Sequence, residues 1–252
     1  MAQIWRDILA ALPQPRLVTL VGGGGKTSLL YHLQMVCRQE AWPAVATSTT
    51  KMAAAPSPWR AYRPVGSEEE LCAAAAQAEE NALIAEGQAA LHGKVDGLPQ
   101  EWIANAARRM PDTYFLVEGD GSAGRSLKGH LAHEPVIPGN SSLVIFVLGL
   151  DAIGQILDER SVHRPQRVAE LAALSLGAIL DEERICALLL QPEGWLKNCP
   201  DGCALVIYLN KSDLPGAQAK AARLAALLKK TWGARLQQVV SGSLREGTFC
   251  LE

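Results

Sequence analysis

The sequence has little net charge of either sign. Its 24 Lys and Arg residues nearly balance its 26 Asp and Glu residues, which gives a formal net charge of −2 at pH 7. A protein that binds nucleic acid or an anionic membrane through its overall electrostatic field carries a clear excess of basic residues. We therefore expect neither a nucleic-acid partner nor a membrane partner.

The chain also lacks a long apolar run. The longest clean run, residues 143–150, is far shorter than the roughly 20 apolar residues that a membrane-spanning helix needs. Near the N-terminus, Arg6 and Asp7 interrupt the only apolar segment, which ends at Pro13, so we expect no secretory signal. Both absences predict a cytoplasmic protein.

The cysteines do not form a regular pattern, and no internal repeat is visible. Of the six cysteines, only Cys199 and Cys203 lie close together, and their three-residue spacing differs from the two-residue spacing of common zinc ribbons. We interpret them as buried thiols at a turn rather than as metal ligands. With 252 residues, the chain is long enough for one large α/β domain with a full core.

What the sequence does contain is a glycine-rich turn between an apolar strand and a helix. Residues 17–21 are apolar or β-branched, and residues 28–38 carry apolar side chains at helical spacing. The turn between them consists of Gly22, Gly23, Gly24, Gly25, Lys26 and Thr27, with Ser28 opening the helix. Glycine backbone can fold around an anion, and the helix N-terminus adds partial positive charge. This turn predicts a phosphate-binding loop.

Lys26 and Thr27 are the residues of the predicted loop whose side chains would contact the phosphates and the metal ion. Lys26 would reach the outer phosphates, and the Thr27 hydroxyl would coordinate Mg²⁺. The first glycine of the common G-x-x-x-x-G-K-[ST] pattern would fall on Leu20, so the loop has the shorter form G-x-x-G-K-T. This form resembles the loops of the Mur ligases, of dethiobiotin synthetase and of the signal-recognition class. The alternative is a mobile turn with a surface lysine, but a Lys-Thr pair that opens a helix after a buried strand favours phosphate binding.

Two further predicted strands deliver polar residues. Residues 42–47 lead to Thr49 and Thr50, which would complete the magnesium shell or sense the terminal phosphate, or would only form a polar strand end.

Residues 113–117 lead to Glu118 and Asp120. A P-loop enzyme needs an acidic residue there to hold Mg²⁺, and Glu118 is our first choice. Asp120 is the alternative metal ligand and would otherwise orient the attacking nucleophile.

The segment after this acidic loop holds the densest set of reactive side chains. It contains Lys128, His130, His133 and Glu134, which could bind an anionic second substrate or a metal. However, its His-x-x-His-Glu order is not the helical H-E-x-x-H zinc pattern, and loop histidines often only satisfy backbone groups. Contact between Lys128 and a phosphate or substrate is therefore one of two open interpretations.

A tetrad typical of GTP-binding proteins follows the predicted strand at residues 204–209. It consists of Asn210, Lys211, Ser212 and Asp213, the pattern N-K-x-D. An Asp carboxylate can accept two hydrogen bonds from guanine, whereas adenine presents the wrong donors. A charged turn is the alternative, but with a phosphate loop upstream the tetrad predicts guanine recognition. Residues 241–243, after the predicted last strand at 236–240, are placed to complete a guanine pocket.

Several of these motifs together resemble one family. They are G-G-G-G-K-T-S, T-S-T-T-K-M, V-E-G-D-G-S-A-G-R-S-L-K, H-E-P-V-I-P, H-R-P and L-N-K-S-D. In combination they resemble the YqeC family, accessory proteins of selenium-dependent molybdenum hydroxylases. The resemblance extends from residue 17 to about residue 240 and is most specific at 117–138. It implies a P-loop nucleotide-binding fold and a role in maturing a selenium-containing molybdenum cofactor.

We expect an α/β fold of the three-layer P-loop NTPase type, with a predominantly parallel sheet and helices on both faces. Residues 1–252 would form a single nucleotide-binding domain. An N-terminal helix would lie within residues 1–15, and residues 52–112 and 152–200 would be helical insertions or crossovers.

Our working hypothesis is a Mg²⁺-dependent nucleoside triphosphatase that prefers GTP, with ATP as the alternative nucleotide. Its hydrolysis or phosphoryl transfer would serve cofactor assembly, with a molybdenum hydroxylase or its cofactor-assembly proteins as partner. Two rival hypotheses remain: an ATP-dependent kinase or ligase that acts on a small anionic substrate, and a non-hydrolysing nucleotide-dependent chaperone. The sequence leaves the oligomeric state open.

Overall fold

A computed structural model of the chain describes residues 3–53, 62–77, 83–86 and 94–252. Its main sheet contains β1 (Leu17–Gly22), β2 (Ala44–Ser48), β4 (Tyr62–Val65), β5 (Leu83–Glu86), β7 (Tyr114–Glu118), β9 (Leu143–Gly149), β11 (Ala204–Asn210), β12 (Gln238–Ser243) and β13 (Thr248–Leu251). Two short pairs lie outside it: β3 (Met52–Ala53) with β6 (Lys94–Val95), and β8 (Leu127–Lys128) with β10 (Val162–His163).

The helices are α1 (Gln3–Ala10), α2 (Lys26–Gln39), α3 (Glu68–Ala76), α4 (Gln100–Arg109), α5 (Pro165–Ala172), α6 (Glu182–Leu189) and α7 (Ala217–Trp232). Two 3₁₀ turns, η1 (Leu150–Ala152) and η2 (Gly233–Arg235), follow β9 and α7. Within the described residues, no helix is long and apolar enough to cross a membrane.

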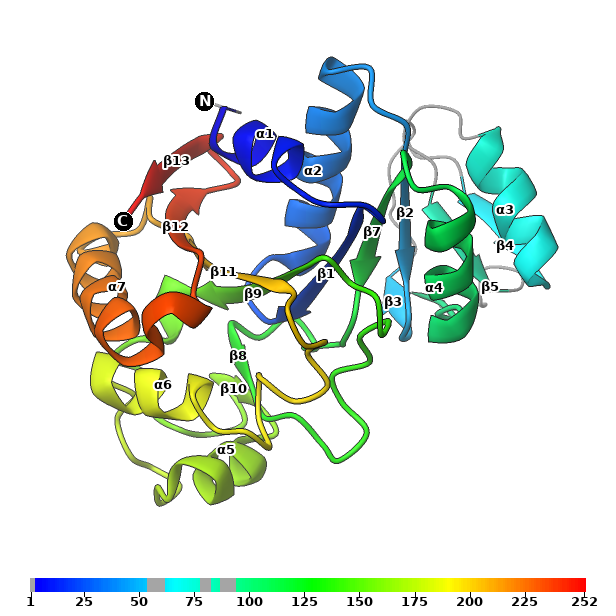
Figure 1. Ribbon diagram of the computed structural model, residues 1–252. Coiled ribbons are helices and arrows are strands. Elements are labelled where there is room, and N and C mark those ends of the chain that lie inside the picture. Colours follow the sequence, from blue (N-terminus) through cyan, green and yellow to red (C-terminus); the bar gives the residue numbers. More distant parts are fainter. Residues whose placement is uncertain (1–2, 54–61, 78–82, 87–93) are drawn as a thin grey trace.

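The strand order is β13-β12-β11-β9-β1-β7-β2-β5-β4 (Figure 1). Every neighbouring pair is parallel except β12 and β13, which are antiparallel. The expected α/β class with a predominantly parallel sheet is confirmed.

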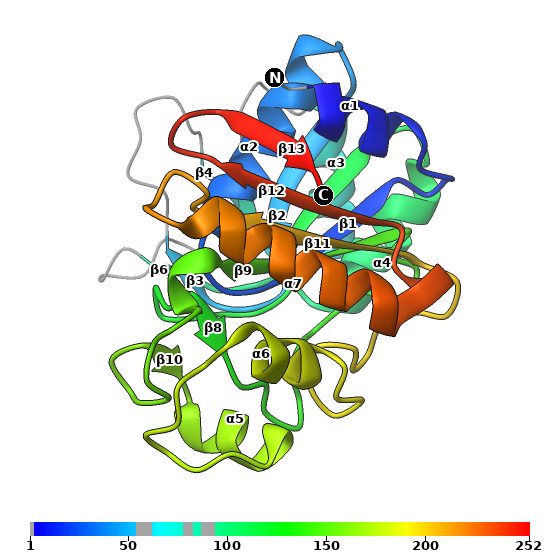
Figure 2. The same cartoon turned by 90° about the vertical axis from the view of Figure 1, so that its left-hand side faces the viewer.

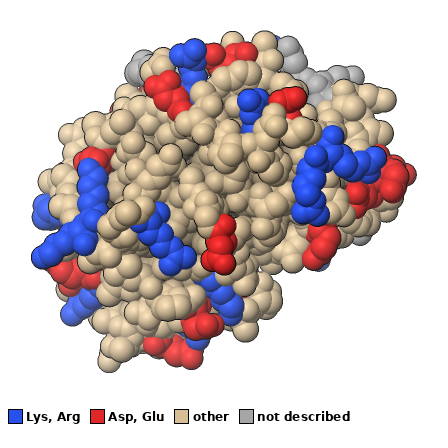
Figure 3. Space-filling view, in the orientation of Figure 1, with Lys and Arg blue, Asp and Glu red and all other residues tan. Residues whose placement is uncertain are grey.

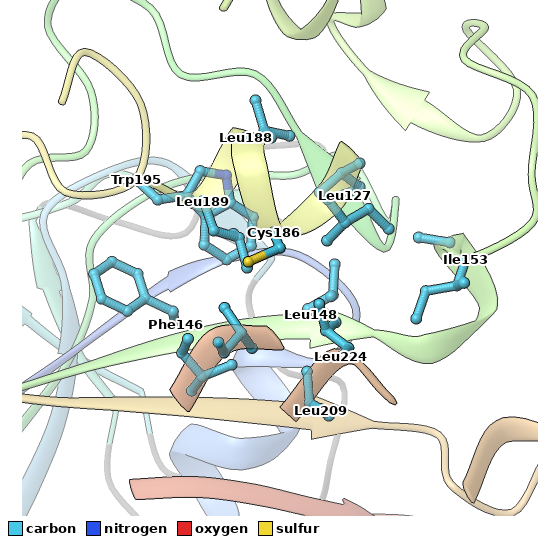
Figure 4. Close-up of a cluster of buried hydrophobic side chains, with 14 of the residues drawn as sticks. Leu127, Phe146, Leu148, Ile153, Cys186, Leu188, Leu189, Trp195, Leu209 and Leu224 are labelled. Atoms are coloured by element: carbon cyan, nitrogen blue, oxygen red, sulfur yellow. The ribbon is translucent and has the colours of Figure 1, made fainter. Parts of the chain in front are cut away.

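Helices cover both faces of the sheet because side chains alternate along its strands. On β1, Val18 and Leu20 face the side covered by α1 and α2, whereas Leu17 and Val21 face the opposite side. That opposite side carries α3, α4, α6 and α7. Figure 4 shows part of it, where Cys186 on α6 lies across from Phe146 and Leu148 on β9.

The two predicted insertions differ in character. Residues 152–200 contain α5 and α6 and, with the short β8–β10 pair, form a lobe (Figure 2). Residues 52–112 contain α3 and α4 and add β4 and β5 to the edge of the sheet.

Other boundary predictions differ in smaller ways. The sequence of residues 53–66 has no regular period and is typical of a loop, but residues 62–65 form β4, and 54–61 lie outside the described residues. The acidic and alanine-rich segment after Ser67 predicts a helix to about residue 81, but α3 ends at Ala76, and residues 78–82 are again outside the described part. The strand predicted at 236–240 is β12, but β13 follows it as the last strand.

The connections around β1 create a reversal of strand order at the centre of the sheet. β1 lies between β7 and β9, although the chain continues from β1 through α2 to β2. Open α/β sheets bind ligands beyond the carboxyl ends of the strands where the strand order reverses in this way. Figure 3 shows acidic and basic side chains interspersed on the face it presents, in agreement with the small net charge.

Candidate functional site

A cleft of about 1050 Å³ opens at the carboxyl ends of β1, β7, β11 and β12. It is lined by residues 24–28, 51–52, 118, 121–124, 210–211, 213–214 and 243–245. The structure therefore brings together the predicted phosphate loop, the acidic loop after β7 and the N-K-x-D tetrad, which are far apart in the sequence.

The first half of the phosphate loop is fastened to neighbouring strands. The Gly22 N–H donates to both carboxylate oxygens of Asp120, at 3.1 and 3.0 Å, and the Gly23 N–H donates to the Val147 carbonyl at 2.8 Å. Gly22 has a φ of 102°, and a Cβ on it would lie 2.4 Å from the Val147 oxygen and 2.5 Å from Trp195. Only glycine fits this position. Gly22 and Gly23 thus shape the loop but do not line the cleft.

The second half of the loop faces the cleft. Gly24, Gly25, Lys26, Thr27 and Ser28 all line it. α2 begins at Lys26, and the N–H groups of its first turn have no acceptor within the helix. These are the N–H groups that the predicted phosphate loop would offer to an anion.

The Lys26 side chain is turned back beneath the loop. It is only 3% exposed, and its ammonium donates to the Gly22 carbonyl at 2.6 Å. The Lys26 nitrogen also lies 3.2 Å from Asp120 Oδ1 and 4.0 Å from Glu118 Oε1. A contact between Lys26 and a phosphate would require the side chain to turn toward the cleft, so this contact stays a prediction.

Thr27 and Glu118 form the oxygen pair expected at a magnesium site. The Thr27 hydroxyl donates to Glu118 Oε2 at 2.6 Å. Glu118 is 6% exposed, and its burial raises its pKa although Lys26 and Thr27 act in the opposite direction. A buried carboxylate whose charge is incompletely balanced, beside a hydroxyl, fits Mg²⁺. Among the described residues, no group of three or more His, Cys, Asp or Glu is arranged so that it could hold a metal ion.

Asp120 lies beneath the phosphate loop and not in the lining of the cleft. It is fully buried, 3.2 Å from the Lys26 ammonium, 3.3 Å from the Lys128 ammonium and 2.5 Å from His130 Nε2. Burial alone would raise its pKa, but Lys26, His130 and Lys128 together hold the pKa of this carboxyl far below its ordinary value. This position does not suit a group that orients a nucleophile in the cleft.

Lys128 connects Asp120 to further charged residues that lie farther from the phosphate loop. Its fully buried ammonium donates to the Gly121 carbonyl at 2.6 Å and lies 3.2 Å from Glu134 Oε2. Glu134 in turn pairs with Arg164, which precedes α5. Positive and negative charges therefore alternate along what we call the buried charge network, namely Lys26, Asp120, Lys128, Glu134 and Arg164. Lys128 does not line the cleft, and its contact with a substrate stays a prediction.

The two histidines of this segment also lie away from the cleft. His130 is fully buried against Trp195, with ring centroids 5.8 Å apart in an edge-on arrangement. Burial lowers its pKa. His133 is exposed, and neither histidine lines the cleft.

Thr49 and Thr50 are close to the acidic loop but do not reach the cleft lining. The Thr49 hydroxyl donates to the Val136 carbonyl at 2.7 Å. The Thr50 hydroxyl oxygen is buried without a partner among the described residues. Their predicted contact with magnesium or phosphate stays a prediction.

At the opposite end of the cleft, Asn210 fastens two loops together. Its amide donates to the Gly24 carbonyl at 2.7 Å, and its Oδ1 accepts from the Tyr208 hydroxyl at 3.0 Å and the Leu244 N–H at 3.3 Å. Asp213 lines the cleft and is partly exposed. The predicted base-reading carboxylate and the loop after β12 are therefore brought to one end of the cleft.

Lys211 lines the cleft and is held by two neighbouring side chains. Its ammonium donates to Ser126 Oγ at 2.8 Å and to Asp151 Oδ2 at 2.7 Å. Its backbone has a φ of 70°, which is uncommon for a residue with a side chain.

Comparisons with known proteins identify the family of the chain. The family model described as "YqeC protein" matches residues 18–166, which is more than half of the chain. The chain belongs to the YqeC family. It is also similar to "Uncharacterized protein YqeC" of Escherichia coli (strain K12), with 33% identity over 209 residues that cover 81% of this chain and 78% of the relative.

The part that matches the YqeC model holds the phosphate loop, Glu118 and the whole buried charge network, whereas Asn210 and Asp213 lie beyond it. Sequence reasoning missed several residues that line the cleft: Met52, Leu214, Leu244 and Arg245. Leu214, Leu244 and Arg245 lie in loops outside the quoted motifs, whereas Met52 ends the motif T-S-T-T-K-M but was given no role there.

Proposed function

We propose that this YqeC-family protein binds a nucleoside triphosphate with Mg²⁺, prefers GTP and hydrolyses it. The observation that carries the proposal is the meeting, in one cleft, of the first turn of α2, the Thr27–Glu118 oxygen pair and the Asp213 carboxylate. Each of these groups matches a different part of such a ligand: the phosphates, the metal ion and the base.

The phosphates would lie against the first N–H groups of α2. Lys26 would leave the Gly22 carbonyl and turn to the terminal phosphates, where its charge stabilises the transferring phosphoryl group. Thr27 and Glu118 would hold the ion. When bound, Mg²⁺ supplies neutralising charge between the phosphate oxygens.

Asp120 takes a positioning role in this proposal. If Lys26 turns to the phosphates, Asp120 keeps Lys128, His130 and the Gly22 N–H as partners. Because Asp120 is not left unpaired, the movement of Lys26 does not incur the full cost of an isolated buried charge. Asp120 would therefore hold the phosphate loop in place through the Gly22 N–H. In the absence of nucleotide it would also hold the Lys26 ammonium in an ion pair.

The base would lie at the Asp213 end of the cleft. The Asp213 carboxylate would accept hydrogen bonds from the guanine N1–H and amino groups, which adenine cannot offer in the same arrangement. Asn210 would support this end by joining the phosphate loop to the loop after β12.

The role of hydrolysis in the cell is inferred from the family resemblance. We propose that it serves the maturation of the cofactor of a selenium-dependent molybdenum hydroxylase in the cytoplasm, with that enzyme or its assembly proteins as partner. The motifs at residues 117–138 support this assignment. The printed name of the Escherichia coli relative adds no activity to it.

A second candidate is phosphoryl transfer to another small molecule instead of to water. The observation that favours it is the extension of the cleft past the phosphate loop to Lys51, Met52 and residues 121–124. Lys128 and His133, the side chains expected to bind such a substrate, do not line this extension.

Phosphate release from GTP and ATP with Mg²⁺ tests the proposal. We expect turnover to fall by about 10²–10³-fold in Glu118→Gln and in Thr27→Ala, because each loses a group that holds the ion at the transferring phosphate. The matched control is Glu101→Gln, at an exposed position on α4 outside the cleft lining, which should turn over like the wild type. Equal turnover in all four proteins would contradict the proposal. Nucleotide binding without turnover in the wild type would instead support the non-hydrolysing chaperone.

A further inference from the structure

A second, smaller cavity adjoins the cleft. It has a volume of about 250 Å³ and shares Gly124 and Lys211 with the cleft lining. Its other lining residues are Arg125, Ser126, Asp151, Ala152, Gln155, Arg160 and Ser161. Glycine aside, Ala152 is the only apolar residue among them, so this side cavity is built for a polar ligand.

The side cavity carries more positive than negative charge. Arg125, Arg160 and Lys211 line it, against the single carboxylate of Asp151. Asp151 Oδ2 lies 2.7 Å from the Lys211 ammonium, so it neutralises that cation. In the described part of the chain, no carboxylate pairs with the guanidinium of Arg125 or of Arg160. The hydrogen bond from the Ser161 N–H and, to a smaller extent, the charge of Arg160 lower the pKa of Asp158, but Arg160 and Asp158 form no ion pair. Both guanidinium groups therefore keep donors for a ligand.

The acidic residues next to Arg160 in the sequence are used elsewhere. Asp158 Oδ1 accepts from the backbone N–H groups of Arg160 and Ser161, both at 3.0 Å, and so closes the turn. Glu159 accepts from Gln166 through its side chain. Neither carboxylate lines the side cavity, and the turn closed by Asp158 holds Arg160 and Ser161 at its wall.

Arg125 also has free donors. Its Nε donates to the Glu159 carbonyl at 3.2 Å, an interaction that fixes the side chain but leaves the two terminal nitrogens. A guanidinium presents several donors in one plane and matches the geometry of oxyanions such as phosphate and carboxylate.

We propose that the side cavity binds a small oxyanion, either free or as the phosphate group of a phosphomonoester, beside the nucleotide cleft. Arg125 and Arg160 supply the charge, and the Ser126 and Ser161 hydroxyls lie in the same wall. Its volume is below the roughly 300 Å³ at which sites for drug-sized ligands begin, so it suits a group of only a few heavy atoms. The site is separate from the phosphate loop, and its existence does not depend on nucleotide hydrolysis.

Calorimetric titration with inorganic phosphate tests this proposal. Because the phosphate loop would also bind phosphate, the titration is carried out with and without Mg²⁺ and a non-hydrolysable GTP analogue. Phosphate binding should persist when the analogue is bound and weaken at least tenfold in Arg125→Gln and in Arg160→Gln. Both side chains are exposed, so folding should be retained, and the thermal midpoint checks this. The matched control is Arg235→Gln, an exposed arginine outside the side cavity, which should bind phosphate like the wild type.

Two results would overturn the proposal. One is the absence of phosphate binding to the wild type. The other is binding that disappears when the analogue is added and is unchanged in Arg125→Gln and Arg160→Gln, which would assign all of it to the phosphate loop. If the analogue itself does not bind, the proposed function fails. The titrations of the two variants without analogue still decide whether the side cavity binds phosphate.

Glycerol 3-phosphate distinguishes the two sources of the oxyanion. Binding at least as tight as that of inorganic phosphate, with the same losses in the two variants, would identify the phosphate end of a larger molecule. If only inorganic phosphate binds, the side cavity takes a free ion.

Discussion

The two ends of the cleft differ in how deeply their charged side chains are buried and in how many charged neighbours those side chains contact. At the phosphate end, Lys26, Glu118 and Asp120 are 3%, 6% and 0% exposed, and the Lys26 ammonium lies 4.0 Å from Glu118 Oε1 and 3.2 Å from Asp120 Oδ1. At the base end, Asp213 lines the cleft with a partly exposed side chain. Substitutions at the phosphate end should therefore affect folding as well as binding, whereas those at the base end should affect selectivity alone.

The largest expected effect belongs to Asp120. Asp120→Ala leaves Lys26 and Lys128 buried beside each other without their shared counter-charge. We expect a loss of about 3–5 kcal/mol in the free energy of unfolding, measured by urea denaturation.

Asp181→Ala is the matched control for this change. Asp181 caps α6 by accepting from the Arg184 N–H, so its loss should lower the free energy of unfolding by only about 1 kcal/mol. Equal losses in the two variants would show that the phosphate end is not held together by its buried charges.

Lys26 should affect turnover more than any group at the base end. Lys26→Met removes the cation that would stabilise the transferring phosphoryl group, so we expect GTP turnover to fall by about 10²–10³-fold. Lys230→Met, at an exposed site on α7, should leave turnover unchanged. Circular dichroism under the assay conditions separates a catalytic loss from unfolding. If the Lys26→Met protein is folded and turns over GTP like the wild type, Lys26 takes no part in the reaction.

The pH dependence of folding provides a third test of the phosphate end. Burial lowers the pKa of His130, and ion pairs lower that of Asp120, so the unfolded chain binds more protons at both groups as the pH falls. Their contribution to stability is therefore complete above pH ~6.5 for His130 and above pH ~4 for Asp120, and is lost below those values. Glu118, with its raised pKa, acts in the opposite direction.

Urea denaturation between pH 7 and pH 5 isolates the part due to His130. His130→Gln should reduce the slope of the unfolding free energy against pH by up to about 1.4 kcal/mol per pH unit. This is the slope that results when the unfolded chain binds one proton more than the folded protein. His133→Gln, in which an exposed histidine of the same segment is replaced, should keep the wild-type slope. If both variants show that slope, His130 does not remain neutral in the folded protein.

The smallest change in free energy is expected at the base end. Asp213→Ala should reduce the preference for GTP over ATP about tenfold, or about 1.4 kcal/mol of binding free energy, and leave the unfolding midpoint unchanged. Competition binding with labelled nucleotide measures the preference, with Asp201→Ala as an exposed control. An unchanged preference in Asp213→Ala would show that the N-K-x-D tetrad does not select guanine and is only a charged turn.

Much of the fold follows from local sequence signals. The order of apolar strand, glycine turn and helix at residues 17–38 predicts β1, the loop and α2, because each element is specified by its own residues. The edge strands were harder to predict. β4 contains Pro64, and most side chains of β13 are exposed, so neither segment has the apolar pattern of a central strand.

The acidic loop shows why the site was predicted only in part. The sequence places Glu118 and Asp120 together after β7, but it cannot show that one carboxylate faces the cleft and the other lies beneath the loop. That difference depends on Lys128 and His130, which fold back to Asp120 from a later segment. The likeness of the motifs to the YqeC family was confirmed, because it rests on residues and not on their placement.

The most direct test of the account is calorimetric titration of the wild-type protein with non-hydrolysable analogues of GTP and ATP in the presence of Mg²⁺. The account predicts one-to-one binding of the GTP analogue, at least about tenfold tighter than that of the ATP analogue. Failure of both analogues to bind at millimolar concentration would contradict the assignment of the cleft as a nucleotide site.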